Sequence, residues 1–250
     1  WTMGPPDTWE KMRGWLSRLP GTLPQPPRAI VVISGHWETR EFAVTGSAHP
    51  PLIYDYSGFP PETYQLQYPA PGDPALAEQI RGLLTAAGFE AKIDAERGFD
   101  HGVFIPFKVI YPAAQIPIVQ LSVLKSLDPA VHLAAGRALA PLRAENVLIV
   151  GSGMSYHNLR ELFRGGKNAD SDRFDGWLTP AVTGTTARER DASLQDWAHA
   201  PAARNAHPRE EHLIPLMVAA GAAGEDRGVR IFSDRVMGAT VSAYGFGLAT

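Results

Sequence analysis

Histidines are the residues of this sequence with the clearest capacity for chemistry. There are eight of them among 250 residues, and the chain has no cysteine. His36 and His157 lie shortly after apolar runs, and His101 lies in a segment, 98–102, with a glycine at each end. Neutral imidazole nitrogens bind Fe(II) and Zn(II), and a ring with a pKa of about 6.5 also moves protons near neutral pH. Together these positions predict an open metal site with acid–base groups beside it.

Further polar residues lie next to these positions. His212 lies near the start of a predicted helix, beside Glu210 and Glu211, and His207 precedes the same segment. We expect His207 to contact the substrate or to support a ligand. Asp100 has two interpretations, as a carboxylate that orients an imidazole or as a turn residue. The remaining histidines are expected at ordinary loop, helix and surface positions: His49, His132 and His199.

Strands and helices alternate along the chain and must position these residues. An Asp-Pro pair opens a predicted helix at residue 73 and another at residue 128, and Gly88 closes the first. This alternation predicts an α/β fold with three layers, α/β/α, around a central mixed, largely parallel sheet. No linker divides the chain, so we expect one domain. The predicted strands are residues 28–34, 89–93, 117–123, 146–151, 229–233 and 239–246, and the predicted helices are residues 7–19, 73–87, 128–143 and 210–223.

Two long irregular stretches, residues 49–72 and 165–172, lie between the predicted elements. Long ordered loops in compact domains often line a site, and open α/β sheets bind ligands beyond the carboxyl ends of their strands. The first stretch carries five aromatic residues, Tyr54 among them. It is interpreted either as the wall of a pocket for a flat ligand or as a loop packed by its own rings.

Composition excludes several classes of protein. With 23 Lys and Arg against 26 Asp and Glu, the net charge is −3, and the chain lacks the basic stripe that nucleic acid requires. The absence of cysteine excludes disulfides and thiolate metal sites. The longest apolar runs are far shorter than the roughly 20 residues that span a membrane. No basic and apolar leader follows Trp1, so we expect a cytoplasmic protein.

Five motifs resemble those of class III extradiol ring-cleaving dioxygenases, and the nearest branch is the one similar to 4,5-DOPA dioxygenase. A single Gly-His-Trp would be weak, but five motifs in the family's order are specific. The resemblance covers essentially the whole chain. The motifs are SGHWE at 34–38, YPAPGDP at 68–74, GFDHG at 98–102, GSGMSYHN at 151–158 and HPREEHL at 207–213.

The resemblance implies an α/β/α fold and assigns roles to four histidines. His36 and His212 match metal ligands, and His157 matches an acid–base residue or an additional ligand. His101 matches a residue that contacts the substrate or dioxygen. Members of the family carry one more ligand histidine, in a Ser-His-Gly segment at the end of a first strand. Nothing precedes Trp1 in this sequence, so the single domain 1–250 is expected to lack that strand and that ligand.

The resemblance implies a metal-dependent dioxygenase that opens the ring of a small catechol-type diol with O₂. Direct reaction of O₂ with a closed-shell catechol is spin-forbidden, so the ion must be redox-active. Fe(II) meets this requirement, and Zn(II) could occupy the same site without meeting it. Two alternatives stay open at this point. One is a zinc-dependent hydrolase that uses the same histidines, and the other is a non-catalytic interaction module on the same fold.

Overall fold

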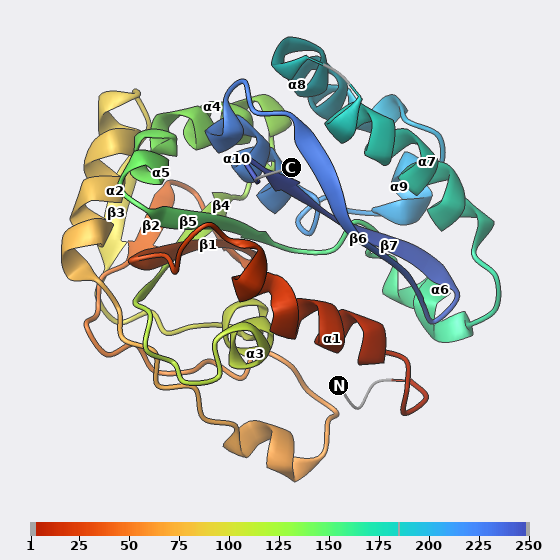
Figure 1. Cartoon of the computed structure of the whole chain (residues 1–250), viewed down its shortest axis with the longest axis horizontal. Helices are drawn as coiled ribbons and strands as arrows, with labels where there is room; N and C mark the ends of the chain where they lie inside the picture. The colour runs from red at the N-terminus through yellow and green to blue at the C-terminus, as the bar shows by residue number, and fades with distance from the viewer. Residues whose placement is uncertain (1–3, 185, 249–250) are drawn as a thin grey trace.

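The central element of the fold is a five-stranded sheet with the order β3-β2-β4-β1-β5 (Figure 1). The structure, a computed structural model, describes residues 4–184 and 186–248. β1 runs parallel to β4 and to β5, β2 runs parallel to β3, and β2 meets β4 in the antiparallel direction. The prediction of a mixed, largely parallel sheet is therefore confirmed. The strands are β1 (Ala29–Thr39), β2 (Phe42–Thr45), β3 (Ala91–Asp94), β4 (Ile118–Leu124) and β5 (Val147–Ser152).

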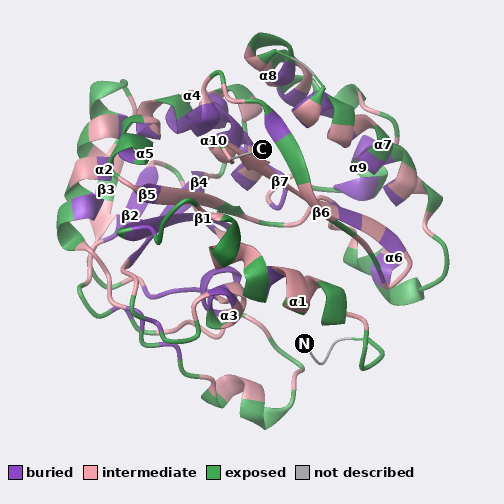
Figure 2. Ribbon diagram, viewed as in Figure 1, coloured by how far each residue is buried: buried purple, intermediate pink, exposed green. Residues whose placement is uncertain are grey.

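Helices cover both faces of this sheet. Side chains alternate along β1, so apolar side chains point to both faces and each face needs a cover. Ile30 and Val32 point into a core formed with α1 (Glu10–Arg18) and α3 (His101–Ile110). Val31 and Ile33 point into a larger core on the other face. That face carries α2 (Pro74–Ala86), α4 (Pro129–Leu139) and α10 (Ile214–Ala223). Figure 2 shows buried residues on the sheet and on α4, and with a core on each face of the sheet the predicted three layers are present.

Three predicted helices have different bounds in the structure. The first begins at Glu10, and a 3-10 helix η1 (Leu19–Thr22) continues it. The one predicted over 128–143 is divided into α4 and α5 (Pro141–Ala144), because proline has no N–H to continue a helix. The one predicted from residue 210 begins only at Ile214, with turns before it. Asp73 and Asp128 cap their helices as expected, with the side chain of each accepting backbone N–H groups.

Several elements were not predicted or differ in arrangement. β2, α3 and the helical region after His157 were missed. The two C-terminal strands pair antiparallel but form a sheet of their own and do not close the central one. Residues 49–72 are irregular apart from η2 (Pro61–Gln65), and residues 165–172 include the start of α7. The additional elements are α6 (Leu159–Arg164), α7 (Ala169–Thr183), α8 (Ala187–Gln195), η3 (Trp197–His199), α9 (Ala203–Ala206), β6 (Gly228–Val236) and β7 (Ala239–Phe246).

An apolar groove of about 510 Å³ runs along β5, which is the last strand on its side among those described. Trp15 and Leu19 from the α1–η1 segment, Leu148 from β5 and Tyr244 from β7 contribute to its walls. The groove also reaches His212. It therefore connects the edge of the sheet with the segment that carries the C-terminal histidine. In the described ranges, no helix is both long and apolar enough to cross a membrane.

Close contact between α4 and α10 fixes the helix that follows His212. A Cβ atom on Gly136 would lie 2.1 Å from the carbonyl oxygen of Val218, and one on Gly221 would lie 2.1 Å from that of Leu133. Side-chain carbon atoms do not approach backbone oxygen this closely. Glycine at these positions therefore lets the two helices pack backbone against backbone.

Gly136→Ala should destabilise the protein by about 1–3 kcal/mol, because the new methyl group forces α4 away from α10. Gly82→Ala is the matched control, since Gly82 lies inside α2 with nothing within 4 Å of the added carbon. That change should stabilise the protein by roughly 0.5–1 kcal/mol through the lower helix propensity of glycine. Urea denaturation measures both. Equal effects of the two substitutions would contradict the assigned contact.

Candidate metal centre

Four histidines from distant parts of the chain form one cluster near the carboxyl ends of β1 and β5. The ring centroids of His36 and His101 are 3.9 Å apart, and those of His36 and His212 are 4.7 Å apart. The rings of His157 and His212 stack at 3.4 Å. The structure thus brings together the four histidines that the sequence motifs single out.

The backbone near His36 is shaped for this meeting. Between β1 and β4, Ile33 pairs with Leu121 and the next pair is Glu38 with Val123. β1 therefore bulges away from the regular register with β4 over the intervening residues. Bulges change the direction of side chains at the ends of strands. A Cβ atom on Gly35 would lie 2.6 Å from the carbonyl oxygen of Glu211. Only glycine lets the segment that carries His36 lie this close to the segment that carries His212.

Asp100 joins β1 to the start of α3. Its buried carboxylate caps α3 by accepting the N–H of Gly102 at 3.0 Å, and it also accepts the hydroxyl of Ser34 at 2.8 Å. The Ser34 hydroxyl oxygen in turn accepts the backbone N–H of His36 at 3.2 Å. Of the two interpretations of Asp100, capping is the one observed, and the residue fixes the backbone near His36 and His101 without bonding to either ring.

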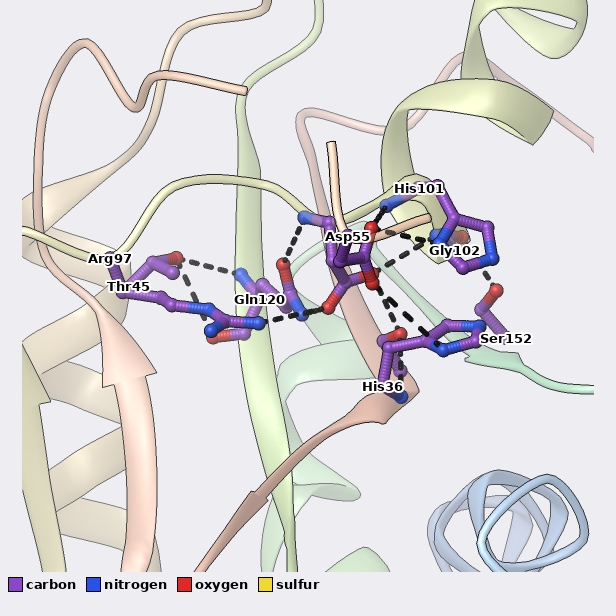
Figure 3. Close-up of polar contacts among 10 residues, drawn as sticks. His36, Thr45, Asp55, Arg97, His101, Gly102, Gln120 and Ser152 are labelled. Carbon is purple, nitrogen blue, oxygen red and sulfur yellow. Dashed lines mark hydrogen bonds and ion pairs between the residues drawn. The ribbon is translucent and has the colours of Figure 1, made fainter. Parts of the chain in front are cut away.

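Other hydrogen bonds hold this region in place (Figure 3). The side-chain amide of Gln120 on β4 donates to the Asp100 carboxylate. The hydroxyl of Ser152, at the end of β5, donates to the carbonyl of Gly102 at 2.6 Å. The guanidinium of Arg97 lies over the ring of Trp37 and within 3.4 Å of Asp100. Strands β1, β4 and β5 therefore all fix the start of α3, where His101 lies.

Two carboxylates that the sequence analysis did not select contact imidazole rings. An oxygen of Asp55 lies 2.8 Å from Nδ1 of His101, and one of Glu211 lies 3.2 Å from Nδ1 of His157. The only sequence signal for Glu211 was its position beside His212. Asp55 had a weaker signal, as an acidic residue within the irregular stretch 49–72, called the aromatic loop from here on. Each carboxylate constrains the orientation of its ring.

An ion pair at the edge of the cluster joins the two segments that carry His36 and His212. The guanidinium of Arg209 makes two contacts with the carboxylate of Glu38, one of them at 2.5 Å. It also lies 3.6 Å from the Glu211 carboxylate. Arginine is suited to such paired contacts because its N–H groups form a planar fork. Arg209 therefore links β1 to the loop before α10.

Burial decides the charge of the two rings at the centre of the cluster, His36 and His212. It lowers the pKa of His36, and the neighbouring His101 lowers it further. Burial, followed by the charges of His157 and His36, lowers the pKa of His212 far below its ordinary value. These rings are neutral near pH 7, so their lone pairs are free to bind a metal ion.

The donor atoms fit a divalent ion that prefers nitrogen and oxygen ligands. Nδ1 of His212 is buried and has no hydrogen-bond partner among the described residues. Two groups of residues could each hold an ion, and each consists of two imidazoles and a carboxylate. Within each group, the ligand atoms lie within 4.8 Å of one another. Such sets suit non-haem iron and also zinc. The groups are His36 with Asp55 and His101, and His157 with Glu211 and His212.

His207 lies behind the cluster. Its ring is fully buried and packs against Phe174 and Trp197. Its Nε2 lies 3.1 Å from the carbonyl oxygen of Ser155, and burial lowers its pKa to about 4. A substrate contact by His207 stays a prediction that this burial does not favour. The geometry instead favours support of the segment that leads to His157.

Tyr54 lies one ring away from the histidines. Its hydroxyl donates to the carbonyl of Leu66 at 2.6 Å, and its ring packs edge-on against Tyr56. Tyr56 in turn packs edge-on against His101, with centroids 5.6 Å apart. The aromatic loop is thus packed by its own rings and also borders the cluster, while its interpretation as the wall of a pocket for a flat ligand stays a prediction. A direct substrate contact by Tyr54 stays a prediction.

The other three histidines lie apart from the cluster, as expected. His132 is buried on α4, where its Nε2 accepts the N–H of Leu124. His199 is exposed and pairs with Asp196. His49 lies in an exposed turn.

A three-layer α/β fold with histidines and carboxylates gathered beyond the ends of its strands is typical of a metal-dependent enzyme. Comparison with known proteins gives the family. Residues 7–249 match the family described as the catalytic LigB subunit of aromatic ring-opening dioxygenase.

Relatives in several organisms agree with this match. The chain is 44% identical over 234 residues to dioxygenase tasH of Hapsidospora irregularis, covering 88% of this chain and 72% of the relative. It is 40% identical over 215 residues to 4,5-DOPA dioxygenase extradiol of Portulaca grandiflora, covering 85% and 78%. A crystal structure of an uncharacterized protein from Escherichia coli K12 has a TM-score of 0.77 and 34% identity, covering 93% of this chain and 90% of that one.

The chain therefore belongs to the LigB family and is an extradiol ring-cleaving dioxygenase, an oxidoreductase. The resemblance drawn from the five motifs is confirmed. Membership of this family favours ring opening over the two alternatives, zinc-dependent hydrolysis and a non-catalytic role.

Proposed function

We propose that this enzyme opens catechol-type rings with O₂ at an Fe(II) ion bound by His36 and His212. The observation that carries the proposal is the pair of neutral imidazoles, the partly buried His36 and the buried His212, whose Nδ1 has no hydrogen-bond partner among the described residues. Fe(II), when bound, supplies the redox-active centre that lets a closed-shell diol react with dioxygen. Zn(II) fits the same donors but does not supply this chemistry.

His157 is the proposed acid–base residue. Its Nδ1 faces Glu211 at 3.2 Å, which leaves Nε2 to accept a proton from a hydroxyl group of the diol. The carboxylate also stabilises the ring when it carries the extra proton. Burial raises the pKa of Glu211, but its hydrogen bonds and the charges of His157 and Arg209 together lower the pKa overall, so this carboxylate stays ionised at neutral pH. His101, with its ring beside His36, is proposed to orient the substrate.

Oxygen uptake tests the proposed activity. Protein loaded with Fe(II) under anaerobic conditions should consume O₂ when a substituted catechol is added, with a yellow ring-opened product. Protein loaded with Zn(II) is the control and should consume none. If the iron-loaded protein consumed no O₂ with any of a broad set of catechols, the proposal would be wrong.

Substitutions separate the two proposed roles. His157→Ala should retain iron but lose about 10²- to 10⁴-fold in turnover, because a positioned acid–base group contributes that much. His36→Ala should instead lose iron, which elemental analysis detects. His199→Ala, at an exposed position, is the control for both measurements. Full turnover in His157→Ala, or full iron content in His36→Ala, would overturn the assignment concerned.

We also propose a place for the further strand that the resemblance implies. The groove along β5 has apolar walls, lies at the edge of the central sheet and reaches His212. A strand added there would pair with the free edge of β5 and bring its last residues to the histidine cluster. The proposed domain thus consists of residues 1–250 with one more strand in this groove.

Lengthening the chain with the first strand of a relative, ending in Ser-His-Gly, should raise both the melting temperature and the affinity for Fe(II). The same extension with alanine in place of its histidine should raise only the melting temperature. Thermal unfolding and iron titration measure the two effects separately. An extension whose amides exchange as fast as those of a free peptide would rule out the groove as its binding place.

A further inference from the structure

Asp55 contacts His101 in a way that specifies the position of a proton. One carboxylate oxygen, Oδ1, lies 2.9 Å from the backbone nitrogen of His101 and 2.8 Å from Nδ1 of its ring (Figure 3). The two residues are 46 positions apart in the sequence. The contact therefore belongs to the tertiary structure and not to a local turn.

Backbone pairing fixes the loop that carries Asp55. The N–H of Ile53 donates to the carbonyl of Phe99 at 2.8 Å, and the N–H of Phe99 donates to that of Pro51 at 2.8 Å. A Cβ atom on Gly98 would lie 2.2 Å from the same Pro51 oxygen, so glycine lets the two segments pair this closely. The loop is thus attached to the segment just before His101, and Asp55 is held where it meets the ring.

The chemistry of the pair determines the tautomer of His101. An ionised carboxylate only accepts hydrogen bonds, so Nδ1 must carry a hydrogen atom. An aspartate carboxyl is ordinarily ionised at neutral pH, and the two N–H groups of His101 that meet Oδ1 favour the ionised form. In the neutral ring, Nε2 then has a free lone pair on the side away from Asp55.

The same arrangement occurs on the other side of the cluster. Glu211 faces Nδ1 of His157 at 3.2 Å, just as Asp55 faces Nδ1 of His101. Two carboxylate–imidazole pairs therefore flank the two central rings, His36 and His212. A vicinal diol has two hydroxyl groups, and each pair presents one Nε2 atom as an acceptor.

We propose that Asp55 is a positioning residue that holds His101 in the Nδ1–H tautomer, so that Nε2 accepts a hydrogen bond from the second hydroxyl of the bound diol. This inference rests on the proposed function and adds a recognition element to it. The competing arrangement is direct metal binding by His36, Asp55 and His101, whose ligand atoms lie within 4.8 Å. In the structure, however, Oδ1 already contacts two N–H groups of His101, whose Nδ1 needs its hydrogen for this bond. Only Oδ2 of Asp55, 4.0 Å from Nδ1 of His36, is left for the competing arrangement.

Nitrogen-15 spectra of histidine-labelled, metal-free protein test the tautomer without substrate. His101 should be in the Nδ1–H form in the parent protein, and Asp55→Ala should remove that preference. Asp196→Asn is the matched control, because Asp196 faces Nδ1 of the exposed His199 at 2.6 Å at the end of α8. It should leave the signal of His101 unchanged. An Nε2–H tautomer in the parent protein, or an unchanged one in Asp55→Ala, would overturn the proposal.

Kinetics test whether the residue acts through His101. Asp55→Asn should lower kcat/KM by about 10- to 100-fold, the range typical of residues that orient an active-site histidine, with unchanged iron content. The same substitution in a His101→Gln background should have almost no further effect. Loss of iron in Asp55→Asn would show direct metal binding, and independent losses from the two substitutions would show separate roles. Either result would overturn the proposal.

The two measurements distinguish failure of this inference from failure of the proposed function. If the parent protein opened no catechol, the proposed function would fail, and the inference would fail with it as a statement about substrate. The tautomer would still show whether Asp55 positions the ring. If the parent were active and its His101 were in the Nε2–H form, only the inference would fail.

Discussion

The site depends on keeping the imidazole rings of His36 and His212 neutral while they lie against other histidine rings with little access to water. Each of the rings of His36 and His212 lies within 5 Å of another histidine ring, measured between centroids. A proton on one of them would be poorly solvated and close to the others, so both burial and neighbouring charge lower the pKa of His36 and of His212. The same conditions leave nitrogen lone pairs without hydrogens, which is what a divalent ion requires. The lowered pKa values and the capacity to bind metal thus have one physical cause.

Nearby carboxylates oppose this effect at His36 without overcoming it, because burial and His101 lower its pKa further than the charges of Asp100 and Asp55 raise it. Asp55 and Glu211 face the outer rings, His101 and His157, through Nδ1. They constrain the two rings that are proposed to exchange hydrogen bonds with the substrate, and the second oxygen of Asp55 also lies 4.0 Å from Nδ1 of His36. Asp100 is closer to the backbone of β1 and α3, where it satisfies N–H and O–H groups. The chain therefore separates acidic residues that orient imidazoles from one that fixes the backbone beneath them.

The sequence predicted the parts of this arrangement that depend on local pattern. The apolar run before His36 predicted a central strand, and the Asp-Pro pairs predicted two helix starts that the structure contains. The motifs indicated four histidines that the structure places together. The four-residue β2 was missed, and α3 was missed because it opens directly at His101 and contains Pro106, which argues against a helix. Asp55 and Glu211 could not be assigned to their rings, because pairing across the chain depends on where the loops return to the sheet.

The aromatic loop shows why sequence pattern alone left two interpretations open. Two of its tyrosine hydroxyls donate at 2.6 Å to carbonyls within the loop itself, that of Tyr54 to Leu66 and that of Tyr56 to Thr63. These bonds satisfy polar groups that would otherwise need solvent, so the loop can hold one conformation without regular secondary structure. A rigid loop can place Asp55 against His101 and Tyr56 at the edge of the same ring. Packing by its own rings is therefore the means by which the loop serves the site.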